Sequence, residues 1–249
     1  MSLEDLVGLS IPLLFVLFWG AERWIGGGRR FAAVRFWPAL GLLGLGVSGA
    51  VNALLPPLLL PGLGAARLTD LSGLGLAGAA PALLLTTLLT YWTHRLQHRF
   101  DTLWRLGHQL HHSVARVDIG SAMIFHPIDL VVQVGATTLA STLLGVTSDA
   151  AALAGLANFV IALFQHWNVA TPHWLGYLVQ RPEAHCLHHQ RDVHARNFGD
   201  LPLWDLLFGT CANPATVDVE VGFEPGRARR VLAMIVCVDV NQAQGRLRL

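Results

Sequence analysis

Five stretches of the chain are almost purely apolar, and polar or glycine-rich sequence separates them. They cover residues 6–19, 36–60, 75–92, 128–146 and 150–164. Because the core of a bilayer requires about 20 apolar residues per helix, this pattern predicts membrane-spanning helices. The first and last stretches are short for a full crossing, so we expect four to five spans. Pro56, Pro57 and Pro61 lie in the second stretch and predict that its helix ends near Leu55.

The arginines are distributed unevenly among the segments that connect these stretches. Four lie between the first two stretches and four follow the third, whereas the segment between the second and third contains only Arg67. Cytoplasmic segments are enriched in basic residues, so this asymmetry predicts an external N-terminus and a cytoplasmic C-terminus. The opening residues, MSLEDL, are acidic and unlike a cleaved signal peptide, so we expect the first helix to remain as a membrane anchor.

The composition favours an integral membrane protein over a soluble domain. Of the 249 residues, 53% are hydrophobic and 13% are charged, whereas soluble domains contain about 25% charged residues. The net charge of +1 gives no reason to expect a nucleic-acid partner. The three cysteines are scattered and form no disulfide or metal-binding motif.

The chain divides into three predicted parts. Residues 1–75 hold the N-terminal membrane helices, residues 76–215 hold every histidine, and residues 216–249 form a cytoplasmic C-terminal tail. Within that tail, residues 217–223 (VDVEVGF) alternate between apolar and other side chains, which predicts a short strand. The predicted fold is nevertheless all-α, with the membrane helices as its frame.

Eight of the twelve histidines form three clusters. The clusters are His94 with His98, then His108 with His111 and His112, and then His185 with His188 and His189. These spacings place side chains on one face of a helix, so each triplet could present three imidazoles to one point. Buried imidazoles need partners, and a metal ion is the simplest partner that several can share. The alternative is a solvated cytoplasmic surface that responds to pH.

The residues around the histidines narrow the choice of metal site. Eight imidazoles exceed one tetrahedral site and fit two metal ions. The sequence contains neither the HExxH motif of zinc peptidases nor the Glu-x-x-His pair of carboxylate-rich diiron bundles. A histidine-rich dinuclear site beside a bilayer points to redox chemistry on a lipid. A membrane electron-transfer protein that binds haem or another metal is the alternative, because His94 and His108 are fourteen residues apart, as are His98 and His112.

The three clusters resemble, in order and spacing, the three histidine boxes of the sterol desaturase and fatty acid hydroxylase superfamily. The resemblance covers roughly residues 92–210 and includes LWRLGHQLHH, which has one extra residue before its first histidine. It also includes FHPID after the second box, FQHWN before the third, and the closing run HHQRDVHARNFGDLPLWDLLFGT. The first two apolar stretches carry no such resemblance.

The resemblance implies a membrane-bound non-haem diiron oxygenase that hydroxylates or desaturates a lipid. The implied ligands of its two iron ions are His94, His98, His108, His111, His112, His166, His185, His188 and His189. His126 and Asn197 are implied as further ligands or as residues that orient one. His173 and His194 fit no box, so we expect neither to bind metal.

The partners also follow from the resemblance. O2 is the implied cosubstrate, and the lipid is expected to enter from the bilayer. The sequence contains no flavin, haem-attachment or iron–sulfur motif, so electrons must come from a separate donor. Together with the arginine asymmetry, these features predict a histidine-rich, metal-binding cap on the cytoplasmic side of a membrane, expected to be the bacterial inner membrane.

Overall fold

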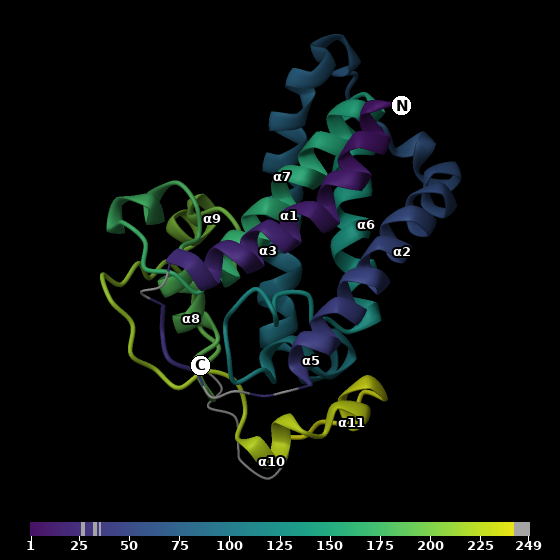
Figure 1. The fold of residues 1–249 in the computed structure, drawn as a ribbon. Coiled ribbons are helices and arrows are strands. Elements are labelled where there is room, and N and C mark those ends of the chain that lie inside the picture. Colours follow the sequence, from purple (N-terminus) through teal and green to yellow (C-terminus); the bar gives the residue numbers. More distant parts are fainter. Residues whose placement is uncertain (26–27, 32–33, 35, 242–249) are drawn as a thin grey trace.

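The chain is a helical bundle with a smaller cap at one end (Figure 1). The computed structural model describes residues 1–25, 28–31, 34 and 36–241. Within these residues no β-strand forms, which confirms the all-α prediction. The helical elements are, in chain order, α1 (Leu3–Ile25), α2 (Trp37–Leu63), η1 (Gly64–Ala66), η2 (Ser72–Gly78), α3 (Ala79–Arg99), α4 (Asp101–Leu103), η3 (Trp104–His108), α5 (Gln109–His112), α6 (Pro127–Leu144), α7 (Ser148–His166), η4 (His173–Tyr177), α8 (Pro182–His188), α9 (Pro202–Leu207), α10 (Pro225–Ala228) and α11 (Val231–Ile235).

Five helical segments of the described chain are long and apolar enough to cross a membrane. They are α1, α2 with η1, η2 with α3, α6, and α7. Helix α3 packs against both α6 and α7, while α1 packs on α7 and α2 packs on α6. In the most apolar part of α2 no residue is buried inside the protein, and even in α6 only 33% are. Apolar side chains therefore cover the outside of the bundle, as expected for helices that face lipid.

Helix α2 is longer than its prolines predict. It continues through Pro56, Pro57 and Pro61 to Leu63, so the expectation that it ends near Leu55 is wrong. The φ angle of proline fits a helix, and each proline removes a single N–H donor. Because a bilayer core offers no water, continuing the helix satisfies the remaining backbone groups better than a loop would.

Two glycines of α2 allow the segment between α5 and α6 to approach closely. A Cβ atom on Gly41 would collide with the carbonyl oxygen of Gly120, and one on Gly44 would collide with that of Met123. The absence of side chains there lets backbone lie against backbone. Helix α2 thereby supports the segment that leads from the second histidine cluster back into the bundle.

The cap closes one end of the bundle, and the N-terminus lies at the opposite end (Figure 1). Its apolar core joins Trp104 and Leu110 to Phe223 and Met234. The side chain of Gln109 holds the C-terminal segment, because its Nε2 donates to the carbonyl of residue 238 at 2.9 Å and its Oε1 accepts from the amide of residue 240 at 3.0 Å. The segment from Phe223 to Val240 therefore packs over α5.

The strand predicted for residues 217–223 does not form. One antiparallel bridge joins Val221 to Gln190, so the strand prediction is wrong. The alternation nevertheless identified the inward-facing side chains correctly, because Val217, Val219 and Val221 pack around the buried Cys186. The segment lies beside the third cluster: the amide of residue 222 donates to the carbonyl of residue 189 at 3.1 Å. Among the described residues it finds a loop and no second strand to pair with.

Candidate metal centre

Nine histidines gather where the cap meets the bundle, and they form two groups. In each group every imidazole offers a nitrogen within 4.8 Å of the others. The first group is His94, His98, His108, His112 and His188, and the second group is His111, His166, His185 and His189. The structure thus brings together all nine histidines that the resemblance implied as ligands.

The imidazoles are removed from solvent. Seven of the nine are at most 5% exposed, and His94 and His98 are partly buried. A solvated, pH-responsive surface would expose its histidines, so this alternative does not describe the cluster. Since a buried charge or an unpaired polar group is costly, the arrangement requires partners for the ring nitrogens.

Each triplet is divided between the two groups, contrary to the expectation that three imidazoles converge on one point. His108 and His112 belong to the first group, whereas His111 between them belongs to the second. In the same way, His185 and His189 belong to the second group, whereas His188 belongs to the first group. In a helix, residues i and i+4 point about 40° apart, while adjacent residues point about 100° apart. Each histidine doublet therefore straddles the two groups and holds them side by side.

The distances between the ring nitrogens fit metal coordination. Nitrogens bound to one ion at about 2.0–2.1 Å, at right angles or tetrahedral angles, lie about 2.8–3.4 Å apart. The Nε2 atoms of neighbouring rings are 3.0–3.2 Å apart in the structure. The pairs are His94 with His98 (3.1 Å), His112 with His188 (3.0 Å), His166 with His185 (3.2 Å) and His185 with His189 (3.1 Å). The donor set and its spacing therefore fit two metal ions.

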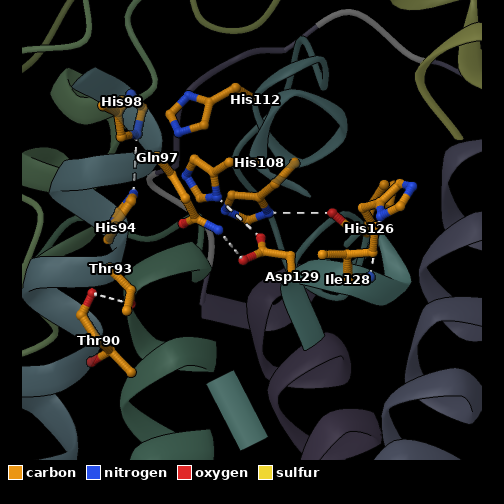
Figure 2. A network of polar contacts seen from close by, with 12 residues as sticks. Thr90, Thr93, His94, Gln97, His98, His108, His112, His126, Ile128 and Asp129 are labelled. Carbon is orange, nitrogen blue, oxygen red and sulfur yellow. Dashed lines mark hydrogen bonds and ion pairs between the residues drawn. The ribbon is translucent and has the colours of Figure 1, made fainter. Parts of the chain in front are cut away.

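A carboxylate orients one ring of the first group. The Nδ1 atom of His108 lies 3.0 Å from Asp129, and the Nε2 atom of Gln97 donates to the other oxygen of Asp129 at 2.8 Å (Figure 2). The Nε2 atom of His108 is buried without a partner among the described residues. A carboxylate on one nitrogen of an imidazole directs the other nitrogen toward a metal and makes it a stronger ligand. Sequence reasoning missed Asp129, although an acidic residue in an apolar stretch, in FHPID, was a signal.

Backbone carbonyls orient four further rings. The Nδ1 atom of His94 donates to the carbonyl of Phe198 at 2.7 Å, and Asp205 fixes that loop by accepting from the amide of Phe198 at 2.9 Å. The other three rings donate from Nδ1 to the carbonyls of residues 196, 124 and 162; they are His188 (2.7 Å), His111 (3.3 Å) and His166 (2.9 Å). These bonds fix which nitrogen of each ring carries the proton and turn the lone pair of Nε2 inward.

The extra residue of the second box is accommodated by a π-helical turn. Element η3 is π-helical from Trp104 to His108, directly before α5. A π turn contains one residue more than an α turn, so it absorbs an insertion without shifting the helix on either side. Gly107 lies in this turn, and a Cβ atom there would lie 3.3 Å from Gln97 Nε2 and 3.4 Å from Asp129 Cβ. The turn and its glycine let His108 reach Asp129.

His126 and Asn197 lie outside both groups. His126 caps α6, because its Nδ1 accepts from the amide of Ile128 at 3.1 Å (Figure 2). Its Nε2 donates to the carbonyl of Ile235 at 3.0 Å. Asn197 holds the segment after α8 against that helix, because its Nδ2 donates to the carbonyl of Ala184, within α8, at 2.9 Å. Both side chains are occupied by backbone contacts, which favours a structural role over metal binding.

The two remaining histidines differ from each other. His173 is on η4, where its Nε2 donates to the carbonyl of Asn213 at 2.9 Å, away from both groups. His194 fits no box, yet its ring centroid lies 4.6 Å from that of Trp104 and 5.2 Å from those of His98 and His112. It belongs to neither group and forms part of the wall of the first one.

Burial keeps the histidines of the cap neutral. Desolvation, together with neighbouring imidazoles, holds the pKa of His112, His185 and His189 well below the ordinary value of 6.5. Neutral imidazoles have a free lone pair, so they can bind a metal near pH 7 without first losing a proton. Burial also raises the pKa of Cys186 to about 12, which leaves this thiol protonated and unsuited to metal binding.

A family model for fatty acid hydroxylases matches residues 79–210, just over half of the chain. The chain belongs to the fatty acid hydroxylase family. The matched range contains both histidine groups of this family member. The resemblance seen in the sequence is thereby confirmed.

Two named relatives support the same superfamily. The chain is 34% identical to the ornithine lipid hydroxylase OlsE of Rhizobium tropici over 130 residues, and this matched region covers 50% of the chain. It is 27% identical to the Delta(7)-sterol 5(6)-desaturase ERG3B of Gibberella zeae over 121 residues, and this matched region covers 46% of the chain. The matched regions span only 38% and 35% of the length of these relatives. No solved structure matches the chain.

Proposed function

We propose that this protein is a membrane-bound non-haem diiron oxygenase that hydroxylates or desaturates a C–H bond of a lipid. The proposal rests on one observation: nine buried or partly buried imidazoles form adjacent groups of five and four at one end of a membrane bundle. Two iron ions held there would supply the activation of O2 that removing hydrogen from an unactivated C–H bond requires. The electrons come from a separate donor, since the sequence carries no motif for a second redox cofactor.

The residues of the chain have distinct tasks in this proposal. The nine histidines hold the ions, and Asp129 keeps His108 turned inward. The buried surroundings exclude water, which protects a strongly oxidising centre from side reactions. The lipid lies between the spans: a cavity lined by residues of α3, α6 and α7 touches histidines of both groups.

The names of the relatives support a lipid substrate. One relative is named for an ornithine lipid and the other for a sterol, and both compounds are membrane lipids. The five apolar helices of this chain place its histidines where such a molecule is dissolved. Hydroxylation and desaturation start from the same hydrogen removal, so both remain within the proposal.

The packing of the rings argues against the haem alternative. The ring centroids of His94 and His108 are 4.4 Å apart, and those of His98 and His112 are 4.6 Å apart. Haem needs axial histidines with room for a porphyrin. Rings in direct contact leave no such room, whereas they suit ions that bind several imidazoles at once.

We further propose that the histidine cap faces the cytoplasm, as in a bacterial inner-membrane protein. The arginines between the first two spans and after the third support this orientation. The bacterial source of one relative supports the choice of membrane. A C-terminal reporter should be active in the cytoplasm, and a reporter active only outside it would contradict the proposal.

Metal analysis and lipid analysis test the proposed activity together. Protein purified without added zinc should contain about two iron ions per chain and no Soret band, and cells that express it should contain an oxidised lipid. His111→Ala should lose iron and the oxidised lipid, while the matched control His173→Ala should keep both. A wild-type protein with zero or one metal per chain, or with haem, would contradict the dinuclear assignment.

A further inference from the structure

A cavity of about 70 Å³, lined by both polar and apolar surface, extends from the histidines into the membrane bundle. One wall consists of imidazoles from both groups, among them His94, His111 and His166. Hydroxyl, amide and carboxyl side chains dominate the rest of the lining: Thr90, Thr93, Gln133, Asn158, Gln165 and Asp200. Polar side chains in a membrane bundle are costly, so their concentration around one cavity indicates a function.

Asn158 lines this cavity and carries an unused acceptor. It lies on α7, two helical turns before His166, and its Oδ1 atom is buried without a hydrogen-bond partner among the described residues. The amide of Gln133, on α6, lines the same cavity. A buried acceptor without a donor is unfavourable, and a bound molecule that supplies an N–H or O–H group would satisfy it.

Asp200 adds an acceptor from the cap. Its carboxylate accepts from Gln165 Nε2 at 2.6 Å and from Thr90 Oγ1 at 3.5 Å. The ion pairs formed within the described part of the chain do not include Asp200. A carboxylate that no described cation pairs with can accept a further hydrogen bond or receive a cation from a ligand.

We infer that this cavity binds the polar end of the lipid substrate through a hydroxyl or ammonium group. An unsubstituted hydrocarbon chain would leave the Asn158 oxygen unpaired and would desolvate Asp200, so it is a poor occupant. Asn158 and Asp200 are thus residues that determine specificity, and they act on the substrate without taking part in its oxidation. The inference rests on the proposed lipid oxidation, because it assigns the cavity to the substrate of that reaction.

The position of the cavity also limits which carbon is oxidised. Thr90 precedes His94 by four residues on α3, which corresponds to about 6 Å along the helix. A donor bound beside Thr90 and Asp200 therefore lies about one helical turn from the histidines. The oxidised carbon is expected within a few bonds of that donor, and the middle of a long acyl chain is excluded.

Binding of three single-chain probes tests the inference without any turnover. The probes are hexadecan-1-ol, hexadecan-1-amine and hexadecyl methyl ether, added to the metal-loaded protein in lipid nanodiscs. The shift in melting temperature, followed against probe concentration, reports binding. We expect the alcohol or the amine to bind at least tenfold more tightly than the ether, which lacks a donor.

Variants locate the binding site. Asn158→Leu should weaken binding of the preferred probe at least tenfold, and Asn158→Asp, which keeps an acceptor oxygen, should restore it. Asp200→Asn should weaken binding of the amine much more than binding of the alcohol if the carboxylate pairs with the ammonium group, and both about equally if it only accepts a hydrogen bond. Thr137→Val, a polar-to-apolar change on α6 outside the cavity, is the matched control and should bind as wild type does.

The outcomes separate this inference from the proposed activity. Equal binding of ether, alcohol and amine, or wild-type binding by Asn158→Leu, would overturn the inference. Iron content and oxidised lipid, measured on the same preparations, test the oxygenase separately. A protein with two iron ions and no preference for a donor would thus disprove only the cavity assignment.

Discussion

The two histidine groups use the same kind of ligand but are held by the protein in different ways. The first has five imidazoles, and the buried carboxylate of Asp129 orients one of them. The second has four, and only backbone carbonyls orient His111 and His166. A carboxylate partner makes an imidazole a stronger ligand, so an ion in the first group should be bound more tightly. The second group, with fewer imidazoles, would leave a bound ion more open to other molecules.

The largest effect is expected from His111 and His112, adjacent proposed ligands that belong to different groups. His111→Ala and His112→Ala should each lower turnover by at least about 100-fold, because the site loses a direct ligand. Iron content should fall from about two to about one in each variant, and the remaining ions should differ in their Mössbauer parameters. Identical spectra of the two variants would show that the division into two groups is wrong.

A smaller effect, confined to one group, is expected from Asp129→Asn. The change removes the negative charge beside His108 and should weaken iron binding in the first group by about 10- to 100-fold. Titration with a chelator should show this: wild type should release the iron of the second group first, and the variant should lose that order. Thr137→Val is the control on α6, and an unchanged release curve for Asp129→Asn would contradict the role of the carboxylate.

Acid should affect the two groups alike in metal-free protein. The pKa values of His111, His112, His185, His188 and His189 are lowered by burial in the folded protein, so below pH 6.5 the unfolded chain binds more protons than the folded one. These histidines therefore do not lower the free energy of unfolding above about pH 6.5. Below that pH the free energy of unfolding decreases, by up to about 1.4 kcal/mol per pH unit for each histidine. Melting temperatures of the metal-free protein between pH 8 and pH 5 measure this. A constant melting temperature would mean that the cap is open to water without metal.

The smallest effects are expected from the two histidines outside the groups. His194→Ala removes a ring that packs on His98 and His112, so turnover should fall by a few-fold while iron content stays near two. His173→Ala removes an exposed contact to Asn213 and should change stability by no more than about 0.5 kcal/mol. Loss of one iron in His194→Ala would make it a ligand of the first group.

Much of this protein could be predicted because its signals are local. Runs of apolar residues identified the membrane helices, since a helix in lipid must be apolar along its whole length. The i, i+4 spacing paired His94 with His98, because one helix determines that distance. By contrast, no local pattern reveals that Asp129 lies beside His108, twenty-one residues earlier in the chain, or that Asn158 faces the same cavity as Asp200. Those contacts depend on how α6 and α7 pack against α3.

The sequence by itself determined the kind of site, and the tertiary structure decided how that site is divided. Three histidine boxes beside apolar stretches specify many imidazoles at a membrane surface, because ligand type and helical spacing are properties of neighbouring residues. The assignment of His111 and His188 to opposite groups depends on the angle at which α5 and α8 face each other across the cap. Likewise, the alternation in residues 217–223 determined which side chains face inward, but a strand needs a partner strand, and among the described residues this segment meets a loop.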